Sequence, residues 1–175
     1  TDSCSFTVEV LDSATVEVTV ELISCAFNPL EEEFTRCIEF EFWNCDLPPG
    51  NQLKATLLQQ MTFKAEDGGL SETIAIASLL CGNYTCLTAR DPLHTLMSSV
   101  NGTGLSIDTT TGNWVADFTG ANGLVGGNCS GDDRVDISDL ALIGFQYLED
   151  IGPDTDCFTI PPHSDFTGDG LVNTL

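Results

Sequence analysis

The stretch Thr15-Val16-Glu17-Val18-Thr19-Val20-Glu21-Leu22 alternates apolar and polar residues without interruption. Successive side chains of a β-strand point to opposite faces of a sheet, so this pattern predicts a strand with one face in a core and the other in water. Strands that are buried on one face only are typical of antiparallel sheets. The stretch therefore predicts a mainly β fold.

Other stretches of the chain show similar patterns. The further predicted strands are Ser5–Leu11, Arg36–Trp43, Leu53–Lys64, Thr73–Leu80 and Trp114–Phe118. Asp12-Ser13 predicts a hairpin turn between Ser5–Leu11 and the first stretch. Thr73–Leu80 is mostly apolar, which predicts a central strand. Several short strands with one polar face together predict an antiparallel β-sandwich.

The charge of the chain excludes two classes of partner. Its 175 residues include 5 Lys or Arg and 27 Asp or Glu, so the net charge is −22. A nucleic-acid binder needs a basic surface, and so does a protein that adsorbs on an anionic membrane. The longest near-continuous apolar run, Thr73–Cys81, is far shorter than the roughly 20 residues of a membrane-spanning helix. The start at Thr1, with no visible signal peptide, is interpreted as a mature or trimmed end.

The cysteines indicate an oxidising compartment. The chain has eight cysteines, no Cys-x-x-Cys pair and only two histidines, which argues against a zinc site and for disulfides in a secreted protein. Pairing between near neighbours is expected: Cys37–Cys45, Cys81–Cys86, Cys4–Cys25 and Cys129–Cys157.

The acidic residues change type along the chain, which predicts two domains. Residues 1–116 contain 16 acids, of which ten are Glu, whereas residues 117–175 contain 11 acids, of which ten are Asp. Asp favours turns over helices, and its short carboxylate suits tight cation-binding loops. We expect a disulfide-stabilised β-sandwich over residues 1–116 and a small module with one helix over residues 117–175. That helix follows Ser138 as N-cap, with Leu140, Ile143, Tyr147 and Leu148 at helical spacing.

The sharpest motif runs from Asn128 to Asp139. A calcium loop of the EF-hand type takes oxygen ligands from positions 1, 3, 5, 7, 9 and 12, the seventh being a backbone carbonyl. Those positions are filled by Asn128, Ser130, Asp132, Arg134 through its carbonyl, Asp136 and Asp139. Two residues depart from the pattern, because position 1 is Asn and position 6 is Asp133 instead of Gly. Since Asp tolerates a left-handed backbone, the loop can form, with weaker binding expected.

A second loop of the same kind lies near the end of the chain. Its ligand positions hold Asp165, Thr167, Asp169, Leu171 through its carbonyl, and Asn173. Gly170 stands at position 6, where the pattern has Gly. The sequence ends at position 11, so either it stops short or another group or chain completes the site. Residues 117–125 are a degenerate copy of residues 165–172, which makes the pair an internal repeat.

These loops resemble the paired repeats of dockerin type I modules, in which a loop ending in Asp-Leu leads directly into a helix. The motif Cys81–Leu96, followed by such loops, is similar to a group of secreted proteins of planctomycete-type bacteria. The resemblance implies export, Ca²⁺ binding and protein–protein attachment outside the cell, and it does not imply catalysis.

Several residues invite sharper interpretations that we do not favour. Asp91 and His94, close to Arg90, could suggest catalysis, but no nucleophile–base arrangement accompanies them, and a salt bridge or turn is expected. Glu31–Glu33 is interpreted as a solvated loop rather than a glycosidase pair. Trp43 and Trp114 are expected in the core or at an interface rather than on a sugar. Asn83, Asn101 and Asn128 head possible glycosylation sequons, and for Asn128 we favour the metal role.

Two functions remain open at this point. The first is a non-catalytic, secreted, calcium-binding structural subunit that joins head to tail into an extracellular filament or cell-surface assembly. The alternative is an attachment module that binds a glycan or a cohesin-like receptor. An incomplete last loop and the acidic surface favour the first, and an enzyme would need a catalytic cluster that the sequence does not offer.

Overall fold

The computed structural model describes residues 13–23, 33–48, 53–80, 84–151, 163–167 and 170–173. Its strands are β1 (Ser13–Val20), β2 (Leu22–Ile23), β3 (Glu33–Trp43), β4 (Leu53–Lys64), β5 (Leu70–Ser71), β6 (Ile74–Leu80), β7 (Cys86–Arg90), β8 (Ser98–Asn101), β9 (Leu105–Ile107), β10 (Trp114–Phe118) and β11 (Leu124–Val125). The helices are the 3₁₀ turns η1 (Gly102–Gly104) and η2 (Gly120–Asn122) and one α-helix, α1 (Ile137–Gln146). The predicted strand Ser5–Leu11 lies outside the described residues.

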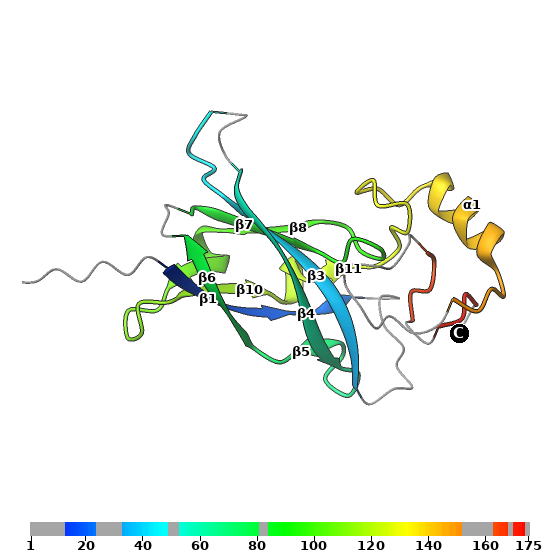
Figure 1. Ribbon diagram of the computed structural model, residues 1–175, viewed down its shortest axis with the longest axis horizontal. Coiled ribbons are helices and arrows are strands. Elements are labelled where there is room, and N and C mark those ends of the chain that lie inside the picture. The colour runs from blue at the N-terminus through cyan, green and yellow to red at the C-terminus, as the bar shows by residue number, and fades with distance from the viewer. Residues whose placement is uncertain are drawn as a thin grey trace, which may run out of the picture.

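Two sheets pack against each other around one apolar core, which confirms a mainly β, sandwich-like fold (Figure 1). One sheet has the strand order β6-β1-β10-β9 and the other β5-β4-β3-β7-β8, while β11 and β2 form a small third sheet. The Phe40 ring of one sheet faces the Phe118 ring of the other, with 6.2 Å between centroids.

The alternating stretches form the strands that they predict. In β1 and β2 the side chains of Val16, Val18, Val20 and Leu22 are all buried. The predicted strands Leu53–Lys64 and Trp114–Phe118 coincide with β4 and β10. Strands β3 and β4 pair antiparallel from Glu33 opposite Lys64 to Trp43 opposite Leu53, so their apolar faces point to the same side.

The pairing of the described strands differs from the expected one. The sheets are not purely antiparallel, because β1 pairs parallel with β10 and β2 pairs parallel with β11. Among the described strands, β6 is an edge strand and not a central one. Strand β1 has β6 on one side and β10 on the other, and the predicted hairpin partner Ser5–Leu11 lies outside the described residues. Alternation reveals which face is buried, but it carries no information on the direction or identity of the neighbouring strand.

The sandwich continues past residue 116. The predicted domain boundary falls inside β10, and Phe118 and Leu124 are fully buried in the core. Residues 117–125 are therefore part of the sheets. The division into residues 1–116 and 117–175 remains a prediction.

One disulfide joins Cys45 to Cys86, with 6.0 Å between their Cα atoms. This pairing rules out both Cys37–Cys45 and Cys81–Cys86. Cys37 is also in a disulfide, and its partner lies outside the described residues. Cys37 lies inside β3 and Cys45 in the turn after it. The six strand steps from Cys37 to Trp43 span about 20 Å, and the two residues to Cys45 cannot recover that distance, so the two cysteines are too far apart to bond.

Cys129 is a free, buried thiol, so the expected Cys129–Cys157 bond is also wrong. Its Sγ–H donates to the backbone oxygen of Asp139 at 3.3 Å. Burial, followed by the charge of Asp139, raises the pKa of Cys129 to about 11. The thiol is therefore neutral at physiological pH and unreactive where it stands.

The predicted helix exists, but its apolar residues do not join the core. Helix α1 lies beyond one end of the sheets (Figure 1), and Leu140, Tyr147 and Leu148 are exposed. Its N-cap is Asp136 instead of Ser138. Within the described part of the chain, no helix has the length and apolar character needed to span a membrane.

Candidate functional site

The loop from Asn128 to Asp139 is held against the turn that follows β7. The backbone N–H groups of Gly127 and Asn128 both donate to the carbonyl of His94, at 2.9 and 3.3 Å. The Asn128 side chain is 1% exposed, and its Nδ2 donates to the Thr95 carbonyl at 3.3 Å. The first ligand position is thus fixed to the sandwich.

This contact gives a structural reason for Asn at position 1. A carboxylate at position 128 has no N–H to offer the Thr95 carbonyl, whereas an amide does. With the nitrogen turned toward Thr95, the Asn128 Oδ1 faces the loop, where it accepts from Ser130 Oγ at 3.4 Å and Gly131 N at 3.0 Å. Asn in place of Asp at position 1 thus lacks one ligand charge but gains a hydrogen bond that holds the loop on the sandwich.

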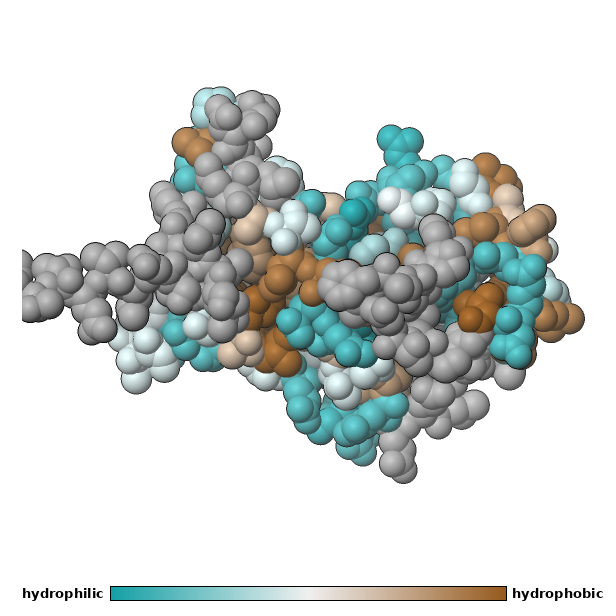
Figure 2. Space-filling view, in the orientation of Figure 1, coloured by the Kyte–Doolittle hydropathy of each residue, from teal (hydrophilic) through white to brown (hydrophobic). Residues whose placement is uncertain are grey.

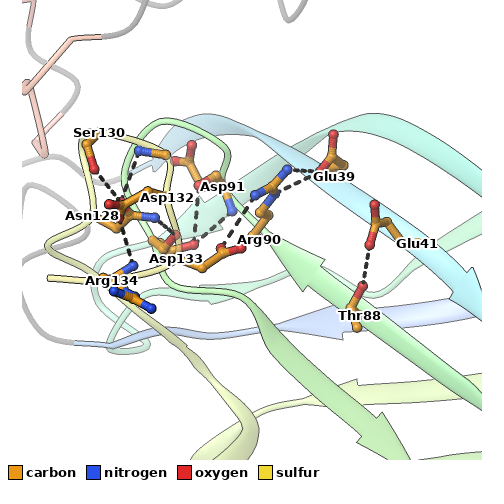
Figure 3. Close-up of polar contacts among 12 residues, drawn as sticks. Glu39, Glu41, Thr88, Arg90, Asp91, Asn128, Ser130, Asp132, Asp133 and Arg134 are labelled. Atoms are coloured by element: carbon orange, nitrogen blue, oxygen red, sulfur yellow. Dashed lines mark hydrogen bonds and ion pairs between the residues drawn. The ribbon is translucent and has the colours of Figure 1, made fainter. Parts of the chain in front are cut away.

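Position 6 has the backbone conformation that a calcium loop requires. Asp133 has a φ of 61°, in the left-handed region that Asp tolerates. The Oδ1 of Asp132 accepts from Arg134 N at 3.0 Å, which tightens the same turn. Arg90 lies between Asp133, at 3.4 Å, and Glu39, at 2.7 Å, and so links the loop to sheet strands β7 and β3 (Figure 3).

The last ligand position, Asp139, closes the loop. Its carboxylate is 2% exposed and accepts from the N–H groups of Cys129, Ser130 and Asp136, all within 2.9 Å. Asp136 in turn accepts from Ser138 N at 2.7 Å and from Asp139 N, and the second of these bonds completes a capping box at the start of α1. Burial alone would raise the pKa of Asp139, but these N–H donors hold it below its usual value. Asp139 is therefore an anion at neutral pH.

Two features of the loop match the EF-hand pattern, the left-handed Asp133 and the helix capped by Asp136, while its carboxylates are not gathered around one point. Among the described residues, no three His, Cys, Asp or Glu side chains lie close enough together to hold one ion. The ligand set, however, also includes an amide, a hydroxyl and a carbonyl, and its acids sit at the positions that the pattern assigns. The residues that would hold Ca²⁺ are Asn128, Ser130, Asp132, Asp136, Asp139 and the carbonyl of Arg134.

The second loop is closed around its own first residue. The Oδ1 of buried Asp165 accepts from the N–H and hydroxyl of Thr167, at 3.1 and 2.9 Å, and its Oδ2 accepts from Gly170 N at 2.8 Å. Gly170 has a φ of 84°, the left-handed conformation expected at position 6. Of the other predicted ligands, Asp169 lies outside the described residues, whereas Leu171 and Asn173 lie within them.

The second loop pairs with the segment after α1. Leu171 forms a β-bridge with Asp150, Leu148 N donates to Val172 O at 2.7 Å, and Val172 N donates to Glu149 O at 3.1 Å. Val172, at position 8, is fully buried. Val135, at position 8 of the first loop, is 56% exposed.

A buried polar cluster lies beneath both loops. His94 Nδ1 is 2.8 Å from Asp91 Oδ2, and Arg36 Nε is 3.6 Å from the same oxygen. The His94 and His163 rings are 4.9 Å apart, and an Arg36 Nη2–H donates to the Phe166 carbonyl at 3.1 Å. Asp91 and His94 thus form the expected salt bridge and turn.

The charge state of Asp91 follows from this cluster. Burial alone would raise the pKa of Asp91, but the charges of His94 and Arg36 and the Leu93 N–H hold it below its usual value. Arg36 and His163 belong to the cluster although no sequence motif indicated them. Arg36 could have been noticed because it interrupts the apolar face of β3 between Phe34 and Ile38.

Among the remaining candidate residues, the two tryptophans make contacts within the fold. Trp114 packs against the core, and the indole N–H of Trp43 donates to Thr88 Oγ1 at 3.3 Å. Glu33 is exposed, while Glu31 and Glu32 lie outside the described residues. Of the three sequon asparagines, Asn101 is exposed, Asn128 is buried and Asn83 lies outside the described residues.

Comparisons with protein-family models, with curated proteins and with solved structures found no match to this chain.

Proposed function

We propose that the protein is a non-catalytic, secreted, calcium-binding structural subunit of an extracellular filament or cell-surface assembly. The observation that carries the proposal is the Asn128–Asp139 loop, which combines a left-handed Asp133, a helix whose N-cap is position 9 and a buried anion at position 12. This combination is what an EF-hand loop needs around its ion.

Calcium bound there would stiffen the whole subunit. The loop shares hydrogen bonds with the turn after β7, and Arg90 links it to β3, so an ion would tie α1 to the sandwich. When bound, Ca²⁺ supplies positive charge to a chain whose net charge is −22. Such a chain repels its own copies, and neutralisation favours their association.

Secretion and self-association are parts of the same proposal. The Cys45–Cys86 disulfide is typical of proteins outside the reducing cytosol. Extracellular calcium sites can have dissociation constants of roughly 10⁻⁴ to 10⁻³ M and still be filled. A head-to-tail contact between unlike surfaces does not close on itself, so it produces an open fibre.

The proposal predicts that assemblies depend on calcium. Negative-stain microscopy of the purified protein in millimolar calcium should show filaments or sheets, and a calcium chelator should shorten or dissolve them. Re-addition of calcium should restore them, whereas magnesium at the same ionic strength serves as the control. Filaments that persist after complete metal removal would contradict the calcium part of the proposal.

The alternative is an attachment module for a glycan or a cohesin-like receptor, and one observation favours it. On α1, Ile137, Leu140 and Phe145 are 73%, 62% and 81% exposed, which leaves large apolar side chains available to a partner. A monodisperse monomer that binds polysaccharide beads or a purified cohesin-like domain would support this function over the first.

A further inference from the structure

Strand β4 offers a long free edge. Strand β3 pairs with it along its whole length, whereas β5 pairs on the other side only at Phe63 and Lys64. Among the strands that the structure describes, none pairs with that side of β4 between Leu53 and Thr62 (Figure 1). Free edges of this length are sites at which another strand can add.

The backbone groups that face the free side can be named. The carbonyls of Thr62 and Lys64 accept from Glu72 and Gly69, at 3.3 and 3.0 Å, on the side of β5. In a β-strand every second residue turns its N–H and C=O to the same side. Gln60, Leu58 and Thr56 therefore present their backbone donors and acceptors to the free side.

The core is incompletely covered along the same edge. Ala55 and Leu57 of β4 and Ile74 of β6, the edge strand of the opposite sheet, pack against the core but are only partly buried. Figure 2 shows hydrophobic surface in the middle of this view, between the positions that β6 and β4 have in Figure 1. An added strand with alternating apolar side chains would cover it.

The sequence contains a segment with this alternation. Ser5–Leu11 alternates around Phe6, Val8 and Val10, and it precedes β1, which has no free side. Its seven residues fit on the ten edge positions from Leu53 to Thr62. That stretch of β4 contains no acid, so an added strand meets little of the repulsion expected from a chain with 27 acids.

The short connection to β1 favours a partner in another copy. Only Asp12 separates Leu11 from Ser13, the first residue of β1, so these two Cα atoms are at most about 7.6 Å apart. The opposite sheet lies about 10 Å from β1, and a slot beyond β6 lies two strand spacings, about 9.6 Å, away. Both distances exceed this reach at Leu11, so another copy is the better-placed partner for a strand that includes it.

We propose that Ser5–Leu11 of one copy adds as a strand to the free edge of β4 in the next copy. This inference rests on the proposed self-association and names the contact that carries it. Because donor and acceptor are different surfaces, the contact is head-to-tail and extends without closing.

Two pairs of full-length variants test the donor and the acceptor. Val8→Pro interrupts the donor strand, and Asp2→Pro is its matched control outside the alternating residues. Gln60→Pro removes an N–H that faces the free edge while leaving the N–H groups that face β3, and Gln60→Thr is its control. Position 8 lies outside the described sheets, so the donor test stands even if Gln60→Pro does not fold.

We expect Val8→Pro to remain monomeric by light scattering under conditions in which the natural chain and Asp2→Pro assemble. A labelled synthetic peptide of residues 1–12 with Cys4→Ser should bind the Val8→Pro protein saturably by fluorescence anisotropy. Adding Gln60→Pro to that protein should weaken peptide binding by at least about tenfold, which corresponds to about 1.4 kcal/mol, whereas Gln60→Thr should not.

Two results would overturn the inference: assembly of Val8→Pro as in the natural chain, or equal peptide binding to the Gln60→Pro and Gln60→Thr proteins. Failure of the proposed function gives a different pattern. Peptide binding without any filaments would support the contact at the β4 edge and contradict the proposed assembly. Chelator-sensitive filaments of Val8→Pro would support the assembly and contradict the strand contact.

Discussion

At the scale of single residues, the clearest feature is the carboxylate of Asp91, which lies between the side chains of His94 and Arg36 beneath the two acidic loops. It is 2.8 Å from His94 Nδ1 and 3.6 Å from Arg36 Nε, and all three side chains are buried. Buried charges are stable only when they are paired. Asp91 is therefore a structural residue that holds the loops on the sandwich.

Replacing Asp91 with Asn should destabilise the fold. The substitution removes the charge of the carboxylate that lies 2.8 Å from His94 and 3.6 Å from Arg36, and the expected loss in free energy of unfolding at pH 7 is about 3–5 kcal/mol. Urea denaturation followed by circular dichroism measures it. Asp46→Asn, at an exposed turn position, is the control and should change stability by less than about 0.5 kcal/mol.

The pH dependence of this effect has a definite sign. Because the pKa of Asp91 is lowered in the folded state, its stabilisation is present above the unfolded-state pKa of about 4 and is lost as pH falls through the folded value. The natural chain and Asp91→Asn should thus approach equal stability in strong acid. A difference that stays constant from pH 7 to pH 2 would contradict the assigned pairing.

At the scale of elements, the two-residue alternation predicted the strands and their buried faces well. It placed Val16, Val18 and Val20 in the core because one periodic signal is enough to orient a half-buried strand. Strand order, parallel pairing and the Cys45–Cys86 bond depend on contacts between residues distant in sequence, which a local pattern does not encode. The loop spacing likewise predicted the left-handed Asp133, but not the anchoring of Asn128 on Thr95.

The anchoring of the first loop makes its own prediction. Asn128→Asp brings a full ligand charge to position 1 but removes the hydrogen bond to the Thr95 carbonyl, with a cost of about 1–3 kcal/mol without calcium. The variant should melt at a lower temperature than the natural chain in chelator and show a larger upward shift on calcium addition. Calorimetric scans with and without calcium measure both. A variant with the natural melting temperature in chelator would show that the Asn128–Thr95 contact contributes nothing.

At the scale of the whole molecule, the loops and the sandwich form one connected structure. Backbone hydrogen bonds from Gly127 and Asn128, the Arg90 ion pairs and the Arg36–Phe166 contact all cross between them. The sequence predicted an acidic module next to a sandwich, but it did not predict that strands β10 and β11 would carry the chain into the loops without a break. An ion in the first loop therefore acts on the same structure that carries the β4 edge.

The most direct test of the calcium assignment is a calorimetric titration of Ca²⁺ into the chelator-treated, dialysed full-length chain, with Asp132→Asn and Asp67→Asn as a matched pair. Asp132 is a proposed ligand, whereas Asp67 lies in the exposed turn between β4 and β5. The account predicts saturable binding that Asp67→Asn retains and Asp132→Asn weakens by at least about tenfold. Absence of binding at millimolar calcium, or equal binding by both variants, would contradict it.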